Sequence, residues 1–259
     1  MTNCPHLQIS EPQQGVLSIR LDKPARLNAV DGEMLAAIEA EITKVDGSDG
    51  RIRVVVITGT GRAFSTGSDL KWLQAHVLAD LAAHQRYQDQ MQRCYQRLER
   101  SRAVVIAAVN GLALAGGLEL ALACDIVIAA EEAELGDEHI TKNFLPSGGA
   151  SQRLPRKIGL ARGLYHLLTG ARLSGTRAAE IGLAAAAVPL AELDAHCLQL
   201  AGRIAKSDAY ALAAMKDLVR RGMELPLDEA LGFERWSQYR YRNESPAMLA
   251  GVKDFATKS

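Results

Sequence analysis

The sequence predicts an α/β fold in which largely parallel strands alternate with helices. Three β-branched apolar runs, each suited to a buried strand, are separated by stretches with helical periodicity. Two of these runs lead into glycine-rich segments, as at the strand-to-helix junctions of α/β proteins. After Gly148 the pattern becomes nearly all helical, which predicts a helical C-terminal part packed on the core.

The first predicted elements are a β-hairpin and an amphipathic helix. Alternating residues at 6–10 and 15–21 flank a turn with proline and glycine, which is typical of a hairpin. After an irregular connection at 23–30, Asp31 is suited to be the N-cap of a helix that continues to about Val45. The apolar face of this helix consists of Met34, Leu35, Ile38 and Ile42.

The central elements alternate between strand and helix. Residues 53–59 are a continuous β-branched run that ends in glycine, as expected of a strand buried on both faces. A polar helix with an apolar stripe follows at about 80–100, and a second buried strand follows at 103–111. Residues 115–124 then predict a short apolar helix and residues 125–130 a third strand.

Helices dominate the rest of the chain, without an internal repeat or a linker. They are expected at about 149–157, 160–168, 176–182, 190–206, 208–222, 226–241 and 246–256. Residues 232–243 mix aromatic and basic side chains, as some RNA-binding segments do. The neutral charge of the chain favours a packed amphipathic helix there, at a subunit interface.

The composition is that of a globular protein without net charge. Thirty basic residues balance thirty acidic ones, so nothing electrostatic favours nucleic acid or an anionic membrane as a partner. No apolar run approaches the ~20 residues of a membrane span, and no secretory signal is apparent. Four scattered cysteines indicate reduced thiols and no metal site. We therefore expect a cytoplasmic protein.

One acidic residue, Glu119, lies in the otherwise apolar run that ends at Asp125. Burying an unpaired carboxylate is costly, and the usual response is a raised pKa. A carboxyl group of this kind is useful as a general acid or base. The alternative is an ion pair with an arginine or lysine elsewhere in the core.

Glycine-rich junctions at 59–70 and 110–119 can direct backbone N–H groups toward a ligand. A dinucleotide site is disfavoured because Phe64 occupies the third glycine position of GxGxxG, and no GK[ST] is present. Tight turns without a ligand are the other alternative. Amide donors near a carboxylate suit chemistry on a carbonyl, where the donors hold an oxyanion and the acid moves a proton.

These segments resemble the enoyl-CoA hydratase/isomerase (crotonase) family. The resemblance rests on residues 23–30, 54–70, 107–130, 144–159 and 168–189, which follow the family's order and spacing. It implies a spiral core of ββα turns with a helical C-terminal trimerisation region, and acyl-CoA thioesters as substrates.

The resemblance also implies a domain organisation and an assembly. We expect the crotonase core with the acyl-CoA site in residues 1–200 and the helical region in residues 201–259, assembled as a homo-trimer or hexamer.

The family polarises the thioester carbonyl with two backbone N–H groups, which by position are those of Ser68 and Gly116. Glu119 matches the first of the two hydratase glutamates. The second glutamate is replaced by His139, and Glu138 lies one residue earlier. This departure leaves open whether His139 donates a proton, orients water or fills space, and whether Glu138 enters the site instead.

For CoA, which is part of the substrate, the resemblance implies a binding path along several residues. These are Arg26, Ser68, Asp69, Leu70, Lys71 and Gly116. Lys258 is expected to reach the CoA of a neighbouring subunit. Simple solvation is the alternative for Arg26 and Lys71. No separate cofactor is expected.

The leading interpretation is a hydratase-type lyase that adds water to, or removes it from, a 2-enoyl/3-hydroxyacyl-CoA thioester. Glu119 would be the base for water, and His139 would help to protonate C2. The alternatives are another reaction of the family, such as hydrolysis, decarboxylation or isomerisation, and a non-catalytic CoA- or RNA-binding member. Because many isomerases of the family use the missing glutamate, isomerisation is disfavoured.

Overall fold

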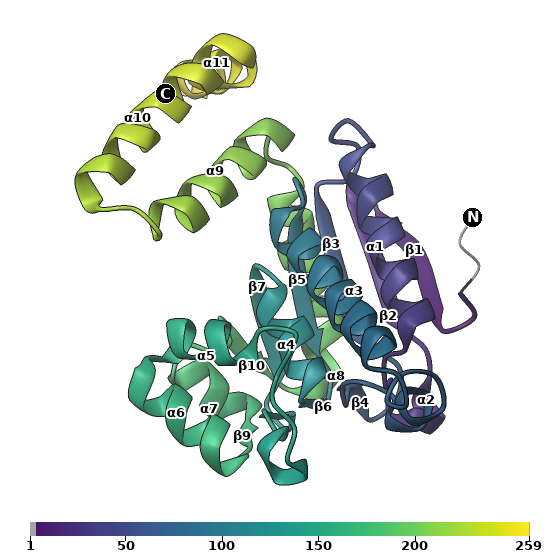
Figure 1. Ribbon diagram of the computed structural model, residues 1–259. Helices are drawn as coiled ribbons and strands as arrows, with labels where there is room; N and C mark the ends of the chain where they lie inside the picture. Colours follow the sequence, from purple (N-terminus) through teal and green to yellow (C-terminus); the bar gives the residue numbers. More distant parts are fainter. Residues whose placement is uncertain (1–3, 259) are drawn as a thin grey trace.

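Two sheets and the helices around them make up residues 4–258, the part of the chain that the computed structural model describes (Figure 1). The side chains at positions 254, 257 and 258 lie outside the described part. The expected contact of Lys258 with a neighbouring CoA therefore lies outside it as well.

The larger sheet has the strand order β1-β2-β3-β5-β7-β10 and is parallel except for the β1–β2 hairpin. Its strands are β1 (Leu7–Gln13), β2 (Val16–Leu21), β3 (Val54–Gly59), β5 (Val104–Val109), β7 (Ile126–Ala130) and β10 (Ala186–Val188). The predicted hairpin and the three predicted buried strands are confirmed, and every residue of β3 is buried. The sequence missed β10, because three half-buried residues carry too little periodicity.

The smaller sheet has the order β4-β6-β8-β9 and was not predicted. Its strands are β4 (Ala63–Ser65), β6 (Leu112–Leu114), β8 (Glu134–Gly136) and β9 (Leu173–Ser174). In the first three cases a long strand of the larger sheet is followed by a short strand of the smaller one and then by helical structure. The repeated ββα unit therefore builds both sheets from one chain pattern.

Helices α1 (Gly32–Asp46), α2 (Leu70–His76), α3 (Leu81–Arg100) and α4 (Gly116–Ala123) pack around these sheets. The predicted N-cap is confirmed, since the Asp31 carboxylate accepts a hydrogen bond from the Met34 N–H at 2.9 Å. Helix α2 was not predicted. Every residue of α4 is buried, which explains why its sequence is apolar on all sides.

All seven helices predicted after Gly148 are confirmed to within a few residues. They are α5 (Ala150–Ile158), α6 (Leu160–Thr169), α7 (Gly175–Glu180), α8 (Leu190–Ile204), α9 (Ala209–Gly222), α10 (Leu227–Glu244) and α11 (Ala247–Lys258). Helix α8 packs on β3, β5 and β7 and spans the expected division at residues 200/201, which stays a prediction.

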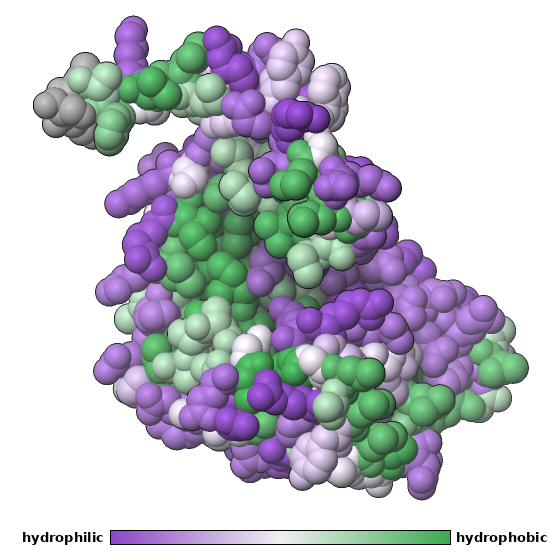
Figure 2. Space-filling model, turned by 90° about the vertical axis from the view of Figure 1, so that its left-hand side faces the viewer, coloured by the Kyte–Doolittle hydropathy of each residue, from purple (hydrophilic) through white to green (hydrophobic). Residues whose placement is uncertain are grey.

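Helices α9 to α11 form an arm that extends away from the sheets (Figure 1). The expectation that the helical C-terminal part packs on the core is therefore wrong for these three helices, and no residue of α9 or α10 is buried. Many of its large apolar side chains are exposed, and Figure 2 shows apolar surface along the arm and in the hollowed face beneath it. They include Met215, Val219, Met223, Leu227, Leu231, Trp236, Tyr239, Leu249 and Val252. Within the described residues, no helix is long and apolar enough to span a membrane.

A partly buried ion cluster joins the arm to the sheet. Asp125, at the start of β7, accepts from Lys216 at 2.7 Å and from Arg220 at 2.8 Å, both on α9. Its carboxylate also accepts from the backbone N–H of Val105. Lys216 also donates to the Leu98 and Ala103 carbonyls, and Arg220 also pairs with Glu99. Removing Asp125 therefore takes away the carboxylate that the two cations share.

We expect Asp125→Ala to lower the free energy of unfolding by about 2 kcal/mol, because two partly buried cations lose their shared carboxylate and the Val105 N–H loses this acceptor. Urea denaturation followed by circular dichroism measures this change. The control is Glu180→Ala, which removes an exposed ion pair with Arg177 and should change stability by less than about 0.5 kcal/mol. Equal effects of the two substitutions would contradict the anchoring role of Asp125.

Candidate active site

Three predicted site residues come together at one edge of the smaller sheet. Strands β4, β6 and β8 are adjacent and parallel, so their carboxyl ends lie at the same edge. Ser68, Gly116 and His139 each lie within three residues after the end of one of these strands. The unpredicted small sheet is therefore what positions the site.

The backbone N–H groups of Ser68 and Gly116 lie side by side. A Cβ placed on Gly116 would lie 3.4 Å from the Ser68 nitrogen, and one on Gly67 would lie 2.7 Å from the Gly116 nitrogen. Gly67 has φ +88°, and Ala115 has the strained combination φ 48° and ψ −118° as it leads into α4. Within the described residues neither amide donates a hydrogen bond to the protein. The pair is thus available to a ligand.

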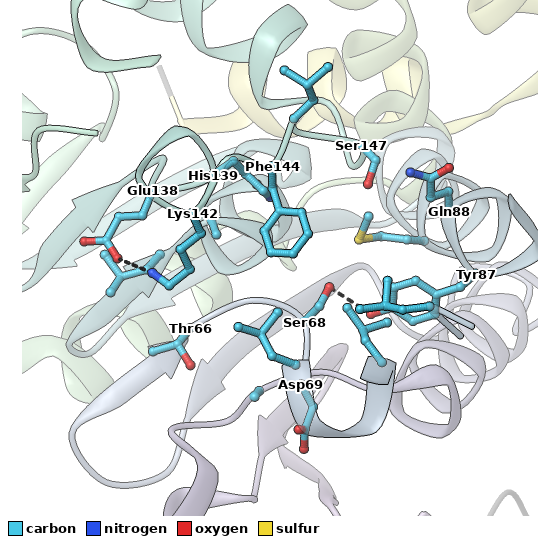
Figure 3. A pocket seen from close by; sticks show the side chains of 18 of the residues that line it. Thr66, Ser68, Asp69, Tyr87, Gln88, Glu138, His139, Lys142, Phe144 and Ser147 are labelled. Atoms are coloured by element: carbon cyan, nitrogen blue, oxygen red, sulfur yellow. Dashed lines mark hydrogen bonds and ion pairs between the residues drawn. The ribbon is translucent and has the colours of Figure 1, made fainter. Parts of the chain in front are cut away.

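Two tyrosines of α3 hold the loops that carry these amides. The Tyr87 hydroxyl donates to the Ser68 Oγ at 2.9 Å, and the Tyr95 hydroxyl donates to the Gly116 carbonyl at 2.9 Å (Figure 3 shows the former). Burial raises the pKa of Tyr87 to about 12, so it remains a neutral donor. From the sequence, both tyrosines are expected only as members of the apolar stripe on the helix at about 80–100. Their hydrogen-bonding role could have been anticipated, because a buried tyrosine hydroxyl needs a hydrogen-bond partner.

The Glu119 carboxylate is completely buried, with no exposed surface. Its Oε1 accepts from the Ala150 N–H at 3.0 Å, and within the described residues its Oε2 has no hydrogen-bond partner. Burial raises its pKa above the ordinary value. A Cβ on Gly148 would lie 2.6 Å from Oε2 and 2.7 Å from the Tyr95 ring, so only glycine fits there.

Arg153 is the arginine to consider for the alternative expected from the sequence, an ion pair with Glu119. Its guanidinium instead pairs with Glu99 at 2.6 Å and donates to the Gly148 carbonyl at 2.5 Å. Arg153 thereby fixes the loop whose Ala150 N–H holds Glu119. The sequence did not identify Arg153, because its partner Glu99 lies on α3, far away along the chain.

His139 faces Glu119, with its Nε2 4.0 Å from the Glu119 Oε2. Its Nδ1 lies 2.9 Å from Oδ1 of Asp137, which the sequence analysis missed. Burial acts to lower the pKa of His139, but the carboxylates of Asp137 and Glu119 outweigh it, and the pKa is raised. The pKa values of the imidazole and of the neighbouring Glu119 carboxyl group are therefore both raised.

Glu138, the other candidate for the second glutamate position, also lines the cavity described below, but its carboxylate is held by two cations. It pairs with Arg172 at 2.5 Å and with Lys142 at 3.8 Å (Figure 3 shows the latter pair). The residue next to Glu119 is therefore His139, and the loop has no bulge that brings Glu138 in.

A cavity of about 600 Å³ opens above this group, a size suited to a small-molecule ligand. Ser68, Leu70, Lys71, Arg26 and His139 line it, and Figure 3 shows the Phe144 ring within it. Apolar side chains form much of the wall; they are Leu73, Leu78, Met91, Leu114 and Leu145. Glu119 is not among the residues that line this cavity, but its Oε2 lies 4.0 Å from the Nε2 of His139, which does line it.

The residues expected to contact CoA occupy different positions around the cavity. Arg26 and Lys71 are exposed at its rim, free to meet phosphate groups. The Asp69 carboxylate instead points away from the cavity in Figure 3 and caps α2, accepting from the Lys71 N–H at 3.1 Å. It also pairs with Lys23 at 3.0 Å, which in turn binds Asp31, the cap of α1, at 2.7 Å. The Asp69 side chain therefore serves the fold.

The enoyl-CoA hydratase/isomerase family profile matches residues 11–259 of the chain. The chain belongs to this family. A probable enoyl-CoA hydratase of Mycobacterium bovis, echA8, is 34% identical over 246 residues, covering 94% of this chain and 93% of that protein. The 2,3-dehydroadipyl-CoA hydratase of Escherichia coli is 36% identical over 223 residues, covering 86% and 85% respectively.

Solved structures of the family have the same fold. The enoyl-CoA hydratase of Bacillus anthracis superposes with a TM-score of 0.93 at 31% identity, covering 98% of this chain and 96% of that one. A Geobacillus kaustophilus structure gives 0.89 at 34% identity, covering 98% and 95%. The expected α/β crotonase fold is thus confirmed, and the protein is an enzyme of the hydratase/isomerase family.

We expect Gly148→Ala to lower kcat on a 2-enoyl-CoA thioester by about 100-fold, because the added methyl group displaces the Glu119 carboxylate. Steady-state kinetics at a fixed pH measures the loss. Gly47→Ala is the matched control, since Gly47 has φ −79° and ordinary space for a Cβ on the surface. Normal kcat in a folded Gly148→Ala protein would show that the carboxylate position does not matter.

Proposed function

We propose that the enzyme is a hydratase-type lyase that interconverts 2-enoyl-CoA and 3-hydroxyacyl-CoA thioesters. The observation that carries the proposal is the pair of amides of Ser68 and Gly116 beside the buried Glu119. Among the described residues these amides donate to no protein acceptor, and the Glu119 Oε2 has no hydrogen-bond partner. The names of the relatives, which include several hydratases, support the same reaction.

In the hydration direction, the two amides bind the thioester oxygen. The Glu119 carboxylate removes a proton from water as the water oxygen bonds to C3, and the electron pair of the double bond moves onto the thioester oxygen as an enolate. Each amide donor contributes about 3–4 kcal/mol to stabilising this charge. The negative charge of the enolate therefore develops on an oxygen toward which both N–H groups already point.

The second half of the reaction uses His139. Its imidazolium donates a proton to C2, the thioester carbonyl re-forms, and a 3-hydroxyacyl thioester results. Glu119 is then protonated and His139 neutral, and a proton transfer across the 4.0 Å between them restores the starting state. Dehydration is the same sequence in reverse.

The CoA part of the substrate fits the rim of the cavity, where Arg26 and Lys71 provide positive charge for its phosphates. The acyl group would occupy the apolar part of the cavity. Coenzyme A arrives with the substrate, so the proposed reaction uses no separate cofactor or metal.

A second candidate is another reaction of the family, such as thioester hydrolysis, and the observation that favours it is His139 in place of a second glutamate. Incubation with a panel of acyl-CoA thioesters and mass spectrometry separates the candidates. Hydration adds one water without releasing CoA, hydrolysis frees the CoA thiol, decarboxylation loses carbon dioxide, and isomerisation leaves the mass unchanged.

We expect a bell-shaped pH profile of kcat/KM. Glu119 acts as a base only when ionised, so activity falls as pH decreases through its pKa, which is raised above 4.5. His139 acts as an acid only when charged, so activity falls as pH increases through its pKa, which is raised above 6.5.

His139→Gln should flatten the alkaline limb and reduce kcat/KM by a factor of about 10²–10⁴, the usual loss for a general acid. Glu119→Gln should be at least as damaging. The measurement is the initial rate of 2-enoyl-CoA hydration as a function of pH for each variant. An unchanged rate and profile for His139→Gln would make His139 a spectator and would favour substrate-assisted protonation.

We also propose a homo-trimer or hexamer in the cytoplasm. The arm of α9–α11 exposes a row of large apolar side chains, which a second copy of the chain would cover. The family resemblance supports the same assembly. The free cysteines favour a reducing compartment.

Light scattering at micromolar concentration should give three or six times the chain mass of 27.9 kDa. Trp236→Glu, on the arm, should shift the mass toward the monomer, because a charge would be buried at the interface. Arg86→Glu, at an exposed position of α3, is the control and should leave the mass unchanged. A monomer at all concentrations would contradict the proposed assembly.

A further inference from the structure

Asp137 is a nearly fully buried carboxylate directly after strand β8, with only 1% of its surface exposed. Its Oδ1 accepts from the His139 backbone N–H at 3.2 Å and lies 2.9 Å from the His139 Nδ1. Within the described residues its Oδ2 has no hydrogen-bond partner. His139 is therefore the only described residue to which this buried carboxylate is hydrogen-bonded.

The contact with Asp137 determines which way the imidazole points. A carboxylate oxygen only accepts hydrogen bonds, so the Nδ1 of His139 must carry a hydrogen. The opposite nitrogen, Nε2, then faces the Glu119 Oε2 at 4.0 Å. The three groups form a row in which a buried acid, an imidazole and a second buried acid alternate.

We propose that Asp137 is a positioning residue that orients His139 toward Glu119 and stabilises the imidazolium that donates the proton to C2. This inference rests on the proposed hydratase reaction. The negative charge of a buried carboxylate interacts strongly with the group that is hydrogen-bonded to it, since little water screens it.

The other charged groups near His139 do not replace Asp137. Glu119 of α4 is the acid that His139 faces, and Lys142 of η2 (Ile140–Lys142) is a cation that acts against imidazolium formation. Glu138 has its charge neutralised by Arg172 and Lys142. Asp137 is thus the anion that bonds directly to the ring, and the raised pKa of His139 agrees with that contact.

A purely structural role is the competing explanation. The bond from the His139 backbone N–H to the Asp137 side chain closes an Asx turn, which asparagine also forms. Asp137→Asn therefore keeps an acceptor for the turn and for the Nδ1–H group, and removes only the charge. The conservative variant separates the electrostatic role from the turn.

The test is a ¹⁵N NMR titration of His139 in the full-length protein, with its resonance assigned by its absence in His139→Gln. In Asp137→Asn we expect a lower pKa for His139, an alkaline limb of kcat/KM moved to lower pH, and a kcat reduced by about 10–100-fold with KM little changed. Glu134→Gln, which neutralises an exposed acid on β8, should change none of these quantities.

The inference is overturned if the pKa of His139 and the alkaline limb stay in place in Asp137→Asn, because the carboxylate would then serve the turn alone. Should that variant fail to fold by circular dichroism, Asp137→Ser provides the same titration, since serine closes a similar turn without charge. If no thioester is hydrated by the wild-type protein, the proposed function fails, while the titration still measures the coupling between Asp137 and His139.

Discussion

A carboxylate without any access to bulk solvent is the constraint on which this structure depends. Glu119 is on a helix whose residues are all buried, so every group around it must either bind it or leave it space. Ala150 supplies a backbone donor, Gly148 leaves room, and Arg153 fixes the loop that contains both. Desolvation raises the pKa of Glu119. A raised pKa suits a carboxylate that is to act as a base near neutral pH.

The chain brings distant segments together through a repeated pattern. Each of three long strands is followed by a strand of three residues, and those short strands align in parallel. The loops that follow them carry the two amides and His139. Strands of the larger sheet and the helices around it share the buried core, while the smaller sheet aligns the loops of the site. The two tyrosines of α3 hold these loops by hydrogen bonds.

Much of the fold could be predicted from the sequence, because long strands and helices carry strong periodicity. The short strands β4, β6 and β8 could not, since three residues do not establish a period. Glu119 was identified because a lone acid in an apolar run is unusual. Asp137 gave no such signal, because its neighbours Glu138 and His139 are also polar.

The choice between Glu138 and His139 shows a second limit of the sequence. Both lie near the position expected for the second acid, and a shift of one residue exchanges them. The choice is made by Arg172, which binds Glu138 from 34 residues away along the chain. No local pattern contains that information.

Three of the groups that define the site are main-chain N–H groups, those of Ser68, Gly116 and Ala150. Such groups are not encoded by any particular codon, and every amino acid except proline retains them. The geometry of these N–H groups therefore comes with the fold itself. The side chains at positions 119 and 139 can change without altering it, whereas a change in the loop geometry would move the N–H groups whatever side chains are present.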